Sequence, residues 1–228
     1  MKKVRPSTMQ SASQRSRILI IDDHVMVREG VAEIINHEPD LAVCCTASTA
    51  NEGLEALRKA KPDLVLVDIT LPGKNGIEFI KDARAFAPDI LILVMSMHDE
   101  SLYVDRVLRA GGRGYIRKQE GGDKLIAAVR RVLRGEIAVS EKMTGRLLEQ
   151  FSGRKTMDSP LENLTDRELE VFQLVGRGLT MKEIGDELHL SPKTVEVHRA
   201  HIREKLHIGS AAELVSYAAR WGQTQGIT

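Results

Sequence analysis

The sequence predicts an α/β domain built on a doubly wound parallel sheet, followed by a small all-α domain. Three observations support this prediction. Five short apolar runs alternate with amphipathic segments between residues 17 and 135, which is typical of consecutive parallel βα units. Residues 164–221 contain helical patterns and no strand pattern. Between the two regions, residues 136–163 become polar and include Gly and Pro, which is typical of a linker.

The strands of the first domain are predicted from continuous apolar, β-branched runs, the pattern of strands buried on both faces. The helices are predicted from apolar residues at helical spacing, and most of them end at Gly or Pro. In chain order, we expect a strand over 17–21, a helix over 25–37, a strand over 41–47, a helix over 49–59, a strand over 64–67, a helix over 77–87, a strand over 90–94, a helix over 102–109, a strand over 114–117 and a helix over 125–134.

The second domain is predicted to have four helices, whose starts are marked by capping residues. Thr165 stands three residues before Glu168, which forms an S/T-x-x-E capping box. Thr180, Ser191 and Ser210 precede the other three helices. The predicted helices cover 166–175, 181–188, 192–206 and 211–220. The tight turn over 189–191, followed by a longer helix, predicts a helix-turn-helix motif.

Composition narrows the class of protein. The formal net charge is +1, so no global field drives binding to nucleic acid or membrane. No apolar run approaches the roughly 20 residues of a membrane helix. The adjacent Cys44 and Cys45 match neither a disulfide framework nor metal-ligand spacing, and we expect core thiols in a reducing cytoplasm. The predicted division is a disordered tail over 1–16 (or a weak basic arm), an α/β domain over 17–135, a partly helical linker over 136–160 and a helical domain over 161–228.

Polar residues stand at the carboxyl ends of the predicted strands. Asp22 and Asp23 follow the first strand, Asp68 the third, Ser96 the fourth and Lys118 the fifth. Taken alone, these residues have simpler readings as a strand-terminating aspartate, a helix N-cap serine and a surface lysine. In a doubly wound sheet, however, ligands bind outside the carboxyl ends of the strands. Their common position therefore favours one shared site.

This arrangement, with LPG after Asp68 and GYIRK at the fifth strand, resembles the receiver domain of two-component response regulators over about 17–135. The resemblance implies the strand order 2-1-3-4-5 and phosphorylation on Asp68. It also implies a Mg²⁺ site, in which Asp23 and Asp68 bind the ion directly, Asp22 binds it through water and Thr70 binds it by its main-chain carbonyl. In the phosphorylated state, Lys118 would pair with one phosphoryl oxygen and Ser96 would hydrogen-bond another. The chemistry is consistent, because oxygen ligands suit Mg²⁺ and a carboxylate can attack a phosphoryl group once charge repulsion is neutralised.

Two further positions are compared with the receiver family. Tyr115 matches the family's aromatic switch, whose ring turns inward as Ser96 moves toward the phosphate. An ordinary half-buried strand tyrosine is an equal alternative. Many receivers have a proline after the lysine that corresponds to Lys118, whereas Gln119 stands here. A cis peptide before a non-proline residue costs about 2.5–4 kcal/mol, so we expect a trans bond at this point.

The segment LTDRELEVFQLVGRGLTMKEIGDELHLSPKTVEVHRAHIREKL closely resembles the LuxR-type DNA-binding domain, and the whole chain resembles the NarL/FixJ class of response regulators. At helical spacing, Val195, Ile202 and Leu206 share an arc predicted to face the core. The opposite arc is predicted to enter the major groove of double-stranded DNA and contains Lys193, Glu196, Val197, Ala200 and Glu204. Phosphate contacts are predicted for Lys182, Lys193, Thr194, Arg199 and Arg203. The alternative for each is an ordinary solvated surface residue, and for Arg199 this alternative has at least equal weight.

The helical region is not basic, which bears on its mode of binding. Residues 161–228 contain eight Lys and Arg against ten Asp and Glu, a net charge of −2. One copy should therefore bind DNA weakly, and a homodimer on a twofold-symmetric promoter site would supply the missing affinity. The resemblance implies that the homodimer forms through the last helix, through the receiver domain or through both. The last helix offers Leu214, Val215, Ala218 and Trp221, some of which could equally be core residues.

The sequence hypothesis is a cytoplasmic, phosphorylation-dependent DNA-binding transcription regulator that accepts a phosphoryl group on Asp68 from a sensor histidine kinase and then changes its dimerisation and promoter binding. It is expected to be no enzyme beyond its own phosphorylation and slow dephosphorylation. One alternative is a phosphorylation-gated protein-interaction adaptor, which predicts no DNA protection. Another is a phosphatase-like enzyme with Asp68 as a transient nucleophile, which predicts turnover of small phosphoesters and leaves the helix-turn-helix unexplained.

Overall fold

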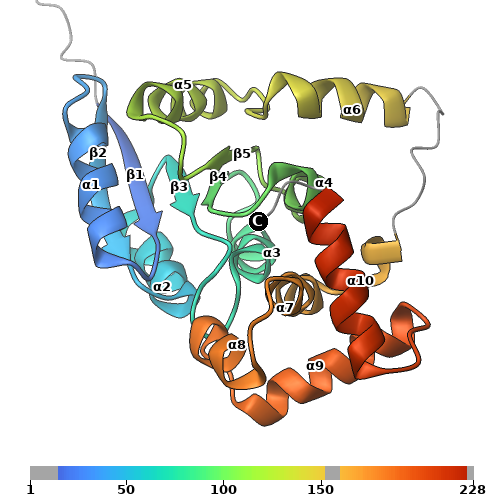
Figure 1. Cartoon of the computed structure of the whole chain (residues 1–228). Helices are drawn as coiled ribbons and strands as arrows, with labels where there is room; N and C mark the ends of the chain where they lie inside the picture. The colour runs from blue at the N-terminus through green and yellow to red at the C-terminus, as the bar shows by residue number, and fades with distance from the viewer. Residues whose placement is uncertain (1–14, 152–159, 225–228) are drawn as a thin grey trace, which may run out of the picture.

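The computed structural model describes residues 15–151 and 160–224, and its first domain is a five-stranded parallel sheet. The strands are β1 (Ser16–Ile21), β2 (Leu41–Ala47), β3 (Leu64–Val67), β4 (Leu91–Ser96) and β5 (Gly114–Arg117). Their order is β2-β1-β3-β4-β5, as Figure 1 shows. The predicted fold class and strand order are confirmed. Residues 1–14 of the predicted tail and 152–159 of the predicted linker region lie outside the described residues.

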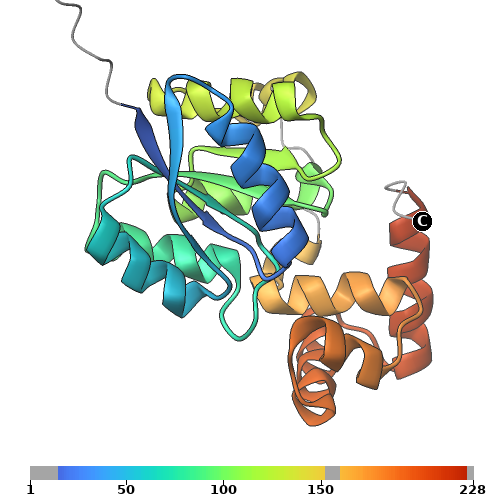
Figure 2. The same ribbon diagram turned by 90° about the vertical axis from the view of Figure 1, so that its left-hand side faces the viewer.

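Helices cover both faces of this sheet. One face is covered by α1 (Val25–Asn36) and α5 (Gly122–Leu133). The other is covered by α2 (Ala50–Ala60), α3 (Gly76–Phe86) and α4 (Glu100–Ala110), and the layers are seen edge-on in Figure 2. Successive strand residues point to opposite faces, so Ile18 and Ile20 pack under α1 and α5 while Leu19 and Ile21 pack on the other side. All four residues of β3 are fully buried, which explains their continuous apolar run.

The edge strand β2 departs from regular pairing. Its register against β1 shifts between Ile18 and Leu19, whose partners are Val43 and Cys45. Cys44 is the extra residue of this β-bulge. The bulge also switches the face that the strand presents, because Val43 packs on the α1–α5 side and Cys45 on the α2–α4 side.

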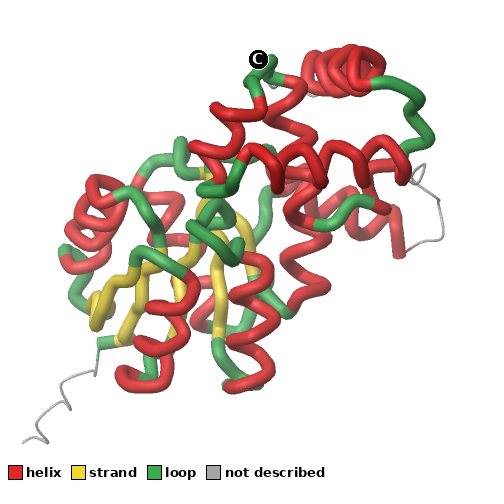
Figure 3. Tube along the Cα trace, turned by 90° about the horizontal axis from the view of Figure 1, so that it is seen from below, coloured by secondary structure: helices red, strands yellow, loops and turns green. Residues whose placement is uncertain are grey.

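The second domain contains helices and no strand among the residues described, which is clear in Figure 3. Its helices are α7 (Asp166–Gly176), α8 (Met181–Leu188), α9 (Pro192–Lys205) and α10 (Ala211–Thr224), preceded by the 3₁₀ turn η1 (Pro160–Asn163). The predicted capping box at Thr165 and Glu168 is present in both directions, and Ser191 caps α9 with Pro192 as its first residue. A Cβ at Gly185 would press on the carbonyl oxygen of Leu190, so glycine permits the tight turn between α8 and α9.

A linker helix stands between the two domains in the chain and packs on the α2–α4 side of the sheet. Helix α6 (Glu141–Phe151) runs beside α4 (Figure 1). Ser140 donates a hydrogen bond to Glu100 at 2.5 Å, and Arg146 donates one to the carbonyl of Ser101 at 3.2 Å. None of the helices in the described parts of the chain is both long and apolar enough to cross a membrane.

The two domains share one continuous apolar core. Residues Leu169–Val175 of α7 are buried on every side, because the helix packs against its own domain and against the receiver-like sheet domain. Arg106 of α4 fastens this interface, donating to the carbonyls of Leu161 at 2.8 Å and Leu164 at 2.7 Å and to the carboxylate of Asp166 at 3.0 Å. Lys81 of α3 also pairs with Asp166, at 3.2 Å. These polar contacts hold the helical domain over the carboxyl edge of the sheet.

Candidate functional site

Three of the predicted side chains meet at the carboxyl edge of the sheet. The Nζ of Lys118 lies 2.6 Å from Oδ2 of Asp68 and 2.7 Å from Oδ2 of Asp22. All three side chains are buried, with Lys118 only 8% exposed. The surface-lysine alternative is therefore wrong, and the lysine instead neutralises two carboxylates.

The loop after β3 explains why Asp68 is held so firmly. The main-chain N–H of Asp68 bonds to the carbonyl of Ile21, which continues the ladder between β3 and β1. The loop then folds back, and the N–H of Gly76 bonds to the carbonyl of Ile69 at 2.7 Å. A Cβ at Gly76 would collide with the carbonyl oxygen of Asp68, so only glycine lets α3 begin this close to the strand end.

The charges of the site are strongly coupled. Burial raises the pKa of Asp68 to about 6, an effect that Lys118 opposes and Asp22 reinforces. Burial alone would lower the pKa of Lys118, but the carboxylates of Asp68 and Asp22 outweigh it and the pKa is raised. The lysine therefore stays protonated, and the two carboxylates share its charge.

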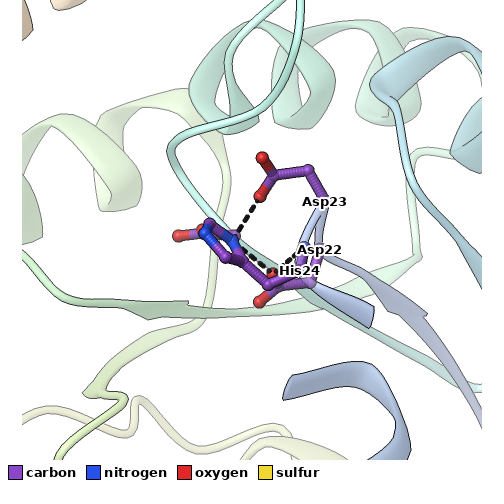
Figure 4. A group of neighbouring side chains, drawn as sticks. Asp22, Asp23 and His24 are labelled. Atoms are coloured by element: carbon purple, nitrogen blue, oxygen red, sulfur yellow. Dashed lines mark hydrogen bonds and ion pairs between the residues drawn. The ribbon is translucent and has the colours of Figure 1, made fainter. Parts of the chain in front are cut away.

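Four residues in this cluster could hold a cation. Asp22, Asp23, His24 and Asp68 each offer a ligand atom, and these atoms lie within 4.8 Å of one another. Figure 4 shows the His24 ring between the two aspartates, with Nδ1 at 2.7 Å from Asp23 and 3.4 Å from Asp22. Within the described residues, the buried Oδ1 of Asp68 has no hydrogen-bond partner. An unpartnered carboxylate oxygen beside two further carboxylates fits a hard, oxygen-preferring cation.

Ser96 and Tyr115 lie at the same edge of the sheet, on β4 and β5. Ser96 is fully buried, and its Oγ accepts a hydrogen bond from the N–H of His98 at 3.3 Å. It is not the N-cap of α4, which is Asp99. Tyr115 is 4% exposed rather than half-buried, and its hydroxyl donates to the carbonyl of His98 at 2.8 Å. The bond between Lys118 and Gln119 is trans, as predicted.

Sequence reasoning missed two histidines at this edge. His24 belongs to the acidic cluster, and the signal was its place directly after the Asp22-Asp23 pair. The ring of His98 lies 3.0 Å from the hydroxyl of Thr70. Burial lowers the pKa of His98 to about 4, assisted by the charges of Arg177 and Lys118, so this ring is neutral at physiological pH. Thr70 lines the pocket, and ligation by its carbonyl stays a prediction.

The helical domain forms the roof of this site. A pocket of about 870 Å³ is lined by Asp23, Asp68 and Lys118 from the sheet domain. Its other wall comes from the α7–α8 region and includes Gln173, Arg177, Glu187 and His189. The Nε2 of His189 lies 3.6 Å from Oδ2 of Asp23. Sequence patterns could not reveal this roof, because its residues are more than 50 positions away along the chain.

Helix α9 presents the face that was predicted to read DNA. Val195 and Ile202 are fully buried and Leu206 is half-buried, in line with the predicted core arc. Every member of the opposite arc is exposed, namely Lys193, Glu196, Val197, Ala200 and Glu204. Of the residues predicted to contact phosphate, Lys182 and Lys193 are exposed while Thr194, Arg199 and Arg203 are half-buried.

The four apolar residues considered for a dimer surface on α10 divide between the core and the surface. Leu214 and Ala218 are buried in the core of the helical domain. The ring of Trp221 packs on Phe172 with centroids 5.7 Å apart. Val215 is 39% exposed, so of the four apolar residues considered for this surface it is the one that faces outward.

This fold and this site define a two-domain response regulator. Residues 18–130 match the response regulator receiver domain family, and residues 162–218 match the luxR family of bacterial regulatory proteins. The chain belongs to the LuxR-type response regulators, a class of phosphorylation-dependent transcription regulators.

Two relatives and two solved structures illustrate the similarity. The oxygen regulatory protein NreC of Staphylococcus carnosus and that of Staphylococcus haemolyticus are each 37% identical over 210 residues, which is 90% of this chain and 97% of the relative. The crystal structure of a LuxR-family two-component response regulator from an Aurantimonas species is 33% identical, covers 61% of this chain and 99% of its own, and has a TM-score of 0.57. RcsB from Salmonella enterica serovar Typhimurium bound to a promoter is 24% identical, covers 91% of this chain and 100% of its own with a TM-score of 0.61, and is similar in fold.

Proposed function

We propose that Asp68 accepts a phosphoryl group from the phosphohistidine of a sensor kinase. A carboxylate oxygen of Asp68 attacks phosphorus, the bond from phosphorus to the imidazole nitrogen breaks, and the nitrogen keeps the electron pair. The product is an acyl phosphate on Asp68. The observation that supports this best is the buried, unpartnered Oδ1 of Asp68 beside the ammonium of Lys118.

The neighbouring residues have distinct proposed tasks. Asp23 and Asp68 directly, Asp22 through water and the carbonyl of Thr70 would hold Mg²⁺, which supplies neutralisation of the charge on the phosphoryl oxygens. Lys118 moves its charge from the carboxylate pair to a phosphoryl oxygen. Ser96 donates to another phosphoryl oxygen in place of accepting from His98, and the buried Tyr115 ring follows that movement.

We further propose that α9 reads promoter DNA in the major groove. The exposed Glu196, Val197 and Ala200 offer one acceptor and two apolar contacts for base edges. Lys182, Lys193, Thr194, Arg199 and Arg203 position the helix on phosphates. Because the domain has a net charge of −2, two copies on a twofold-symmetric site are required for strong binding. Phosphorylation promotes this homodimer through the receiver and through the outward edge of α10 near Val215.

The proposed regulator works in the cytoplasm and catalyses no reaction beyond its own phosphorylation and slow dephosphorylation. Its division is a receiver over 17–135, a linker over 136–160 and a DNA-binding domain over 161–228. In the closed arrangement the reading face of α9 is exposed, whereas the Asp68 pocket is roofed by α7 and α8. The interdomain contact therefore restrains phosphorylation and dimer formation rather than covering the reading helix.

The phosphoacceptor assignment is tested with acetyl phosphate and Mg²⁺. Intact-mass spectrometry should show one added phosphoryl group on the wild type and none on Asp68→Asn. Asp105→Asn on α4 is the matched control and should be labelled normally, because Asp105 lies outside the Asp68 pocket and pairs with Arg109. Labelling of Asp68→Asn at the wild-type level would remove the assignment.

The DNA assignment is tested by capturing genomic fragments with and without the phosphodonor. We expect twofold-symmetric sites whose enrichment increases with acetyl phosphate. Val197→Glu should weaken binding to a captured site by about tenfold or more, since one base contact contributes about 1–3 kcal/mol. Leu148→Glu, at a position 64% exposed on α6, should have no effect. If no fragment is enriched in either state, the protein-interaction adaptor replaces this proposal.

A further inference from the structure

The β-bulge in β2 creates a pair of adjacent thiols on one side of the sheet. In a regular strand, neighbouring side chains point to opposite faces. Here the extra residue Cys44 breaks that alternation, since Leu19 pairs with Cys45 directly after Ile18 pairs with Val43. The Sγ atoms of Cys44 and Cys45 lie 3.3 Å apart. Both residues are half-buried on the edge strand, so a small reagent can reach them.

The geometry of this pair disfavours an internal disulfide. The peptide between the two cysteines is trans, so their Cα atoms are about 3.8 Å apart. Disulfides usually join Cα atoms about 4.4–6.8 Å apart, and departures from that range are strained and readily reduced. A bridging atom between the sulfurs avoids this strain, because it leaves them close to their present separation.

The separation of the two sulfurs suits a pyramidal centre better than a tetrahedral one. With bonds of about 2.3 Å from sulfur to the bridging atom, sulfurs 3.3 Å apart subtend an angle of about 90°. Trivalent arsenic and antimony bond through p orbitals at angles near a right angle. Tetrahedral zinc needs a wider angle and two more ligands. The present sulfur separation does not give the wider angle, and β2 has no cysteine or histidine besides the pair to provide the two further ligands.

The protonation of the pair points to the same chemistry. Burial raises the pKa of Cys45 to about 12, and the hydrogen bond and charge of Cys44 add to the effect. Oxidation and metal chelation require thiolates, which this thiol resists. Condensation with an arsenic hydroxide uses the protonated thiol, because the thiol proton leaves with the hydroxide as water.

We propose that Cys44 and Cys45 form a bidentate site for trivalent arsenicals and the related antimony compounds. Two arsenic–sulfur bonds form and two arsenic–oxygen bonds break. For an arsenic dihydroxide, the two thiol protons and the two hydroxides leave as two molecules of water. Arsenic stays trivalent throughout, so no oxidant or reductant takes part.

The test uses phenylarsine oxide, a monosubstituted trivalent arsenical, on the reduced full-length protein. The adduct is followed by intact-mass spectrometry during a chase with excess glutathione, a monothiol. The wild type should keep one phenylarsenic group through the chase and release it to 1,2-ethanedithiol. Because the chain has two cysteines, Cys44→Ser and Cys45→Ser each leave a single thiol. Both variants should lose the adduct at least tenfold faster.

A matched variant isolates the contribution of the bulge. Cys44→Ser combined with Thr46→Cys keeps two adjacent cysteines, but places them in the regular part of β2 on opposite faces. Folding of each variant is verified by its thermal transition. The double variant should lose the adduct as fast as the single variants in folded protein and should match the wild type in denaturant, where any adjacent pair can chelate. Equal retention by the folded double variant and the wild type, or loss from the wild type at the single-variant rate, would overturn the proposal.

Discussion

Replacing Arg106 with methionine tests whether the interdomain contact controls phosphorylation. The Arg106 side chain is 17% exposed, and its guanidinium makes three hydrogen bonds to the start of the helical domain. Each hydrogen bond that involves a charged group contributes about 1.5–3 kcal/mol, and bonds from one group are not additive. We therefore assign about 3 kcal/mol to the set. That amount shifts the ratio of open to closed molecules by about a hundredfold.

The assay is the initial rate of Asp68 phosphorylation by acetyl phosphate at saturating Mg²⁺. Because the pocket is roofed by α7 and α8, the rate should rise with the open fraction, up to the rate of a fully open protein. Small-angle scattering reports the opening independently. Arg109→Met on the same helix is the control, since Arg109 is 74% exposed and pairs within α4. An Arg106→Met protein that opens in scattering but is phosphorylated at the wild-type rate would refute the gating role of the roof.

Three further outcomes follow from buried groups. Burial raises the pKa of Glu170 from 4.5 to about 7 despite its pairing with Arg167. A carboxyl group whose pKa is higher in the folded state stabilises that state at low pH. The free energy of unfolding should therefore fall by about 3 kcal/mol as pH rises from 4.5 through 7. Glu170→Gln should flatten this urea-denaturation profile, and an unchanged slope would contradict the shift. Lys118→Met should slow phosphorylation yet raise Mg²⁺ affinity by about tenfold or more, measured calorimetrically, because a buried positive charge beside the cation is removed. Gly76→Ala should destabilise the protein by about 3 kcal/mol, because the added Cβ collides with the Asp68 carbonyl. Gly30→Ala, in open space on α1, should stabilise it by about 0.5–1 kcal/mol. Equal melting temperatures for the two variants would contradict the collision at Gly76.

The sequence predicted the sheet because its local signals agree with its tertiary surroundings. The four residues of β3 are apolar because both faces are covered. The predicted polar residues converge because the carboxyl ends of parallel strands share one edge. The capping residues Thr165 and Thr180 placed the starts of α7 and α8 correctly, since capping is local chemistry.

Features that depend on distant residues were not predicted. Nothing local in Leu214 or Ala218 distinguishes a core position from a dimer surface, because an apolar helix face serves either purpose. The burial of Glu170 and Gln173 contradicts their polarity and becomes intelligible only once the sheet domain covers α7. The approach of His189 to Asp23 joins residues far apart in the chain. The bulge at Cys44 is likewise a property of the pairing with β1 rather than of the residue.

Helix α7 packs against both domains within their shared core, and this has an evolutionary consequence. The hydroxyl of Tyr103 on the receiver side donates to Gln173 of α7 at 3.3 Å inside the buried interface. A substitution at either residue changes the packing of the DNA-binding domain and, at the same time, the contact that holds the two domains together. Such a position cannot drift independently in either domain. Among relatives that keep this closed arrangement, we expect residues 103 and 173 to change together, so that the two domains are inherited as one unit rather than exchanged freely between regulators.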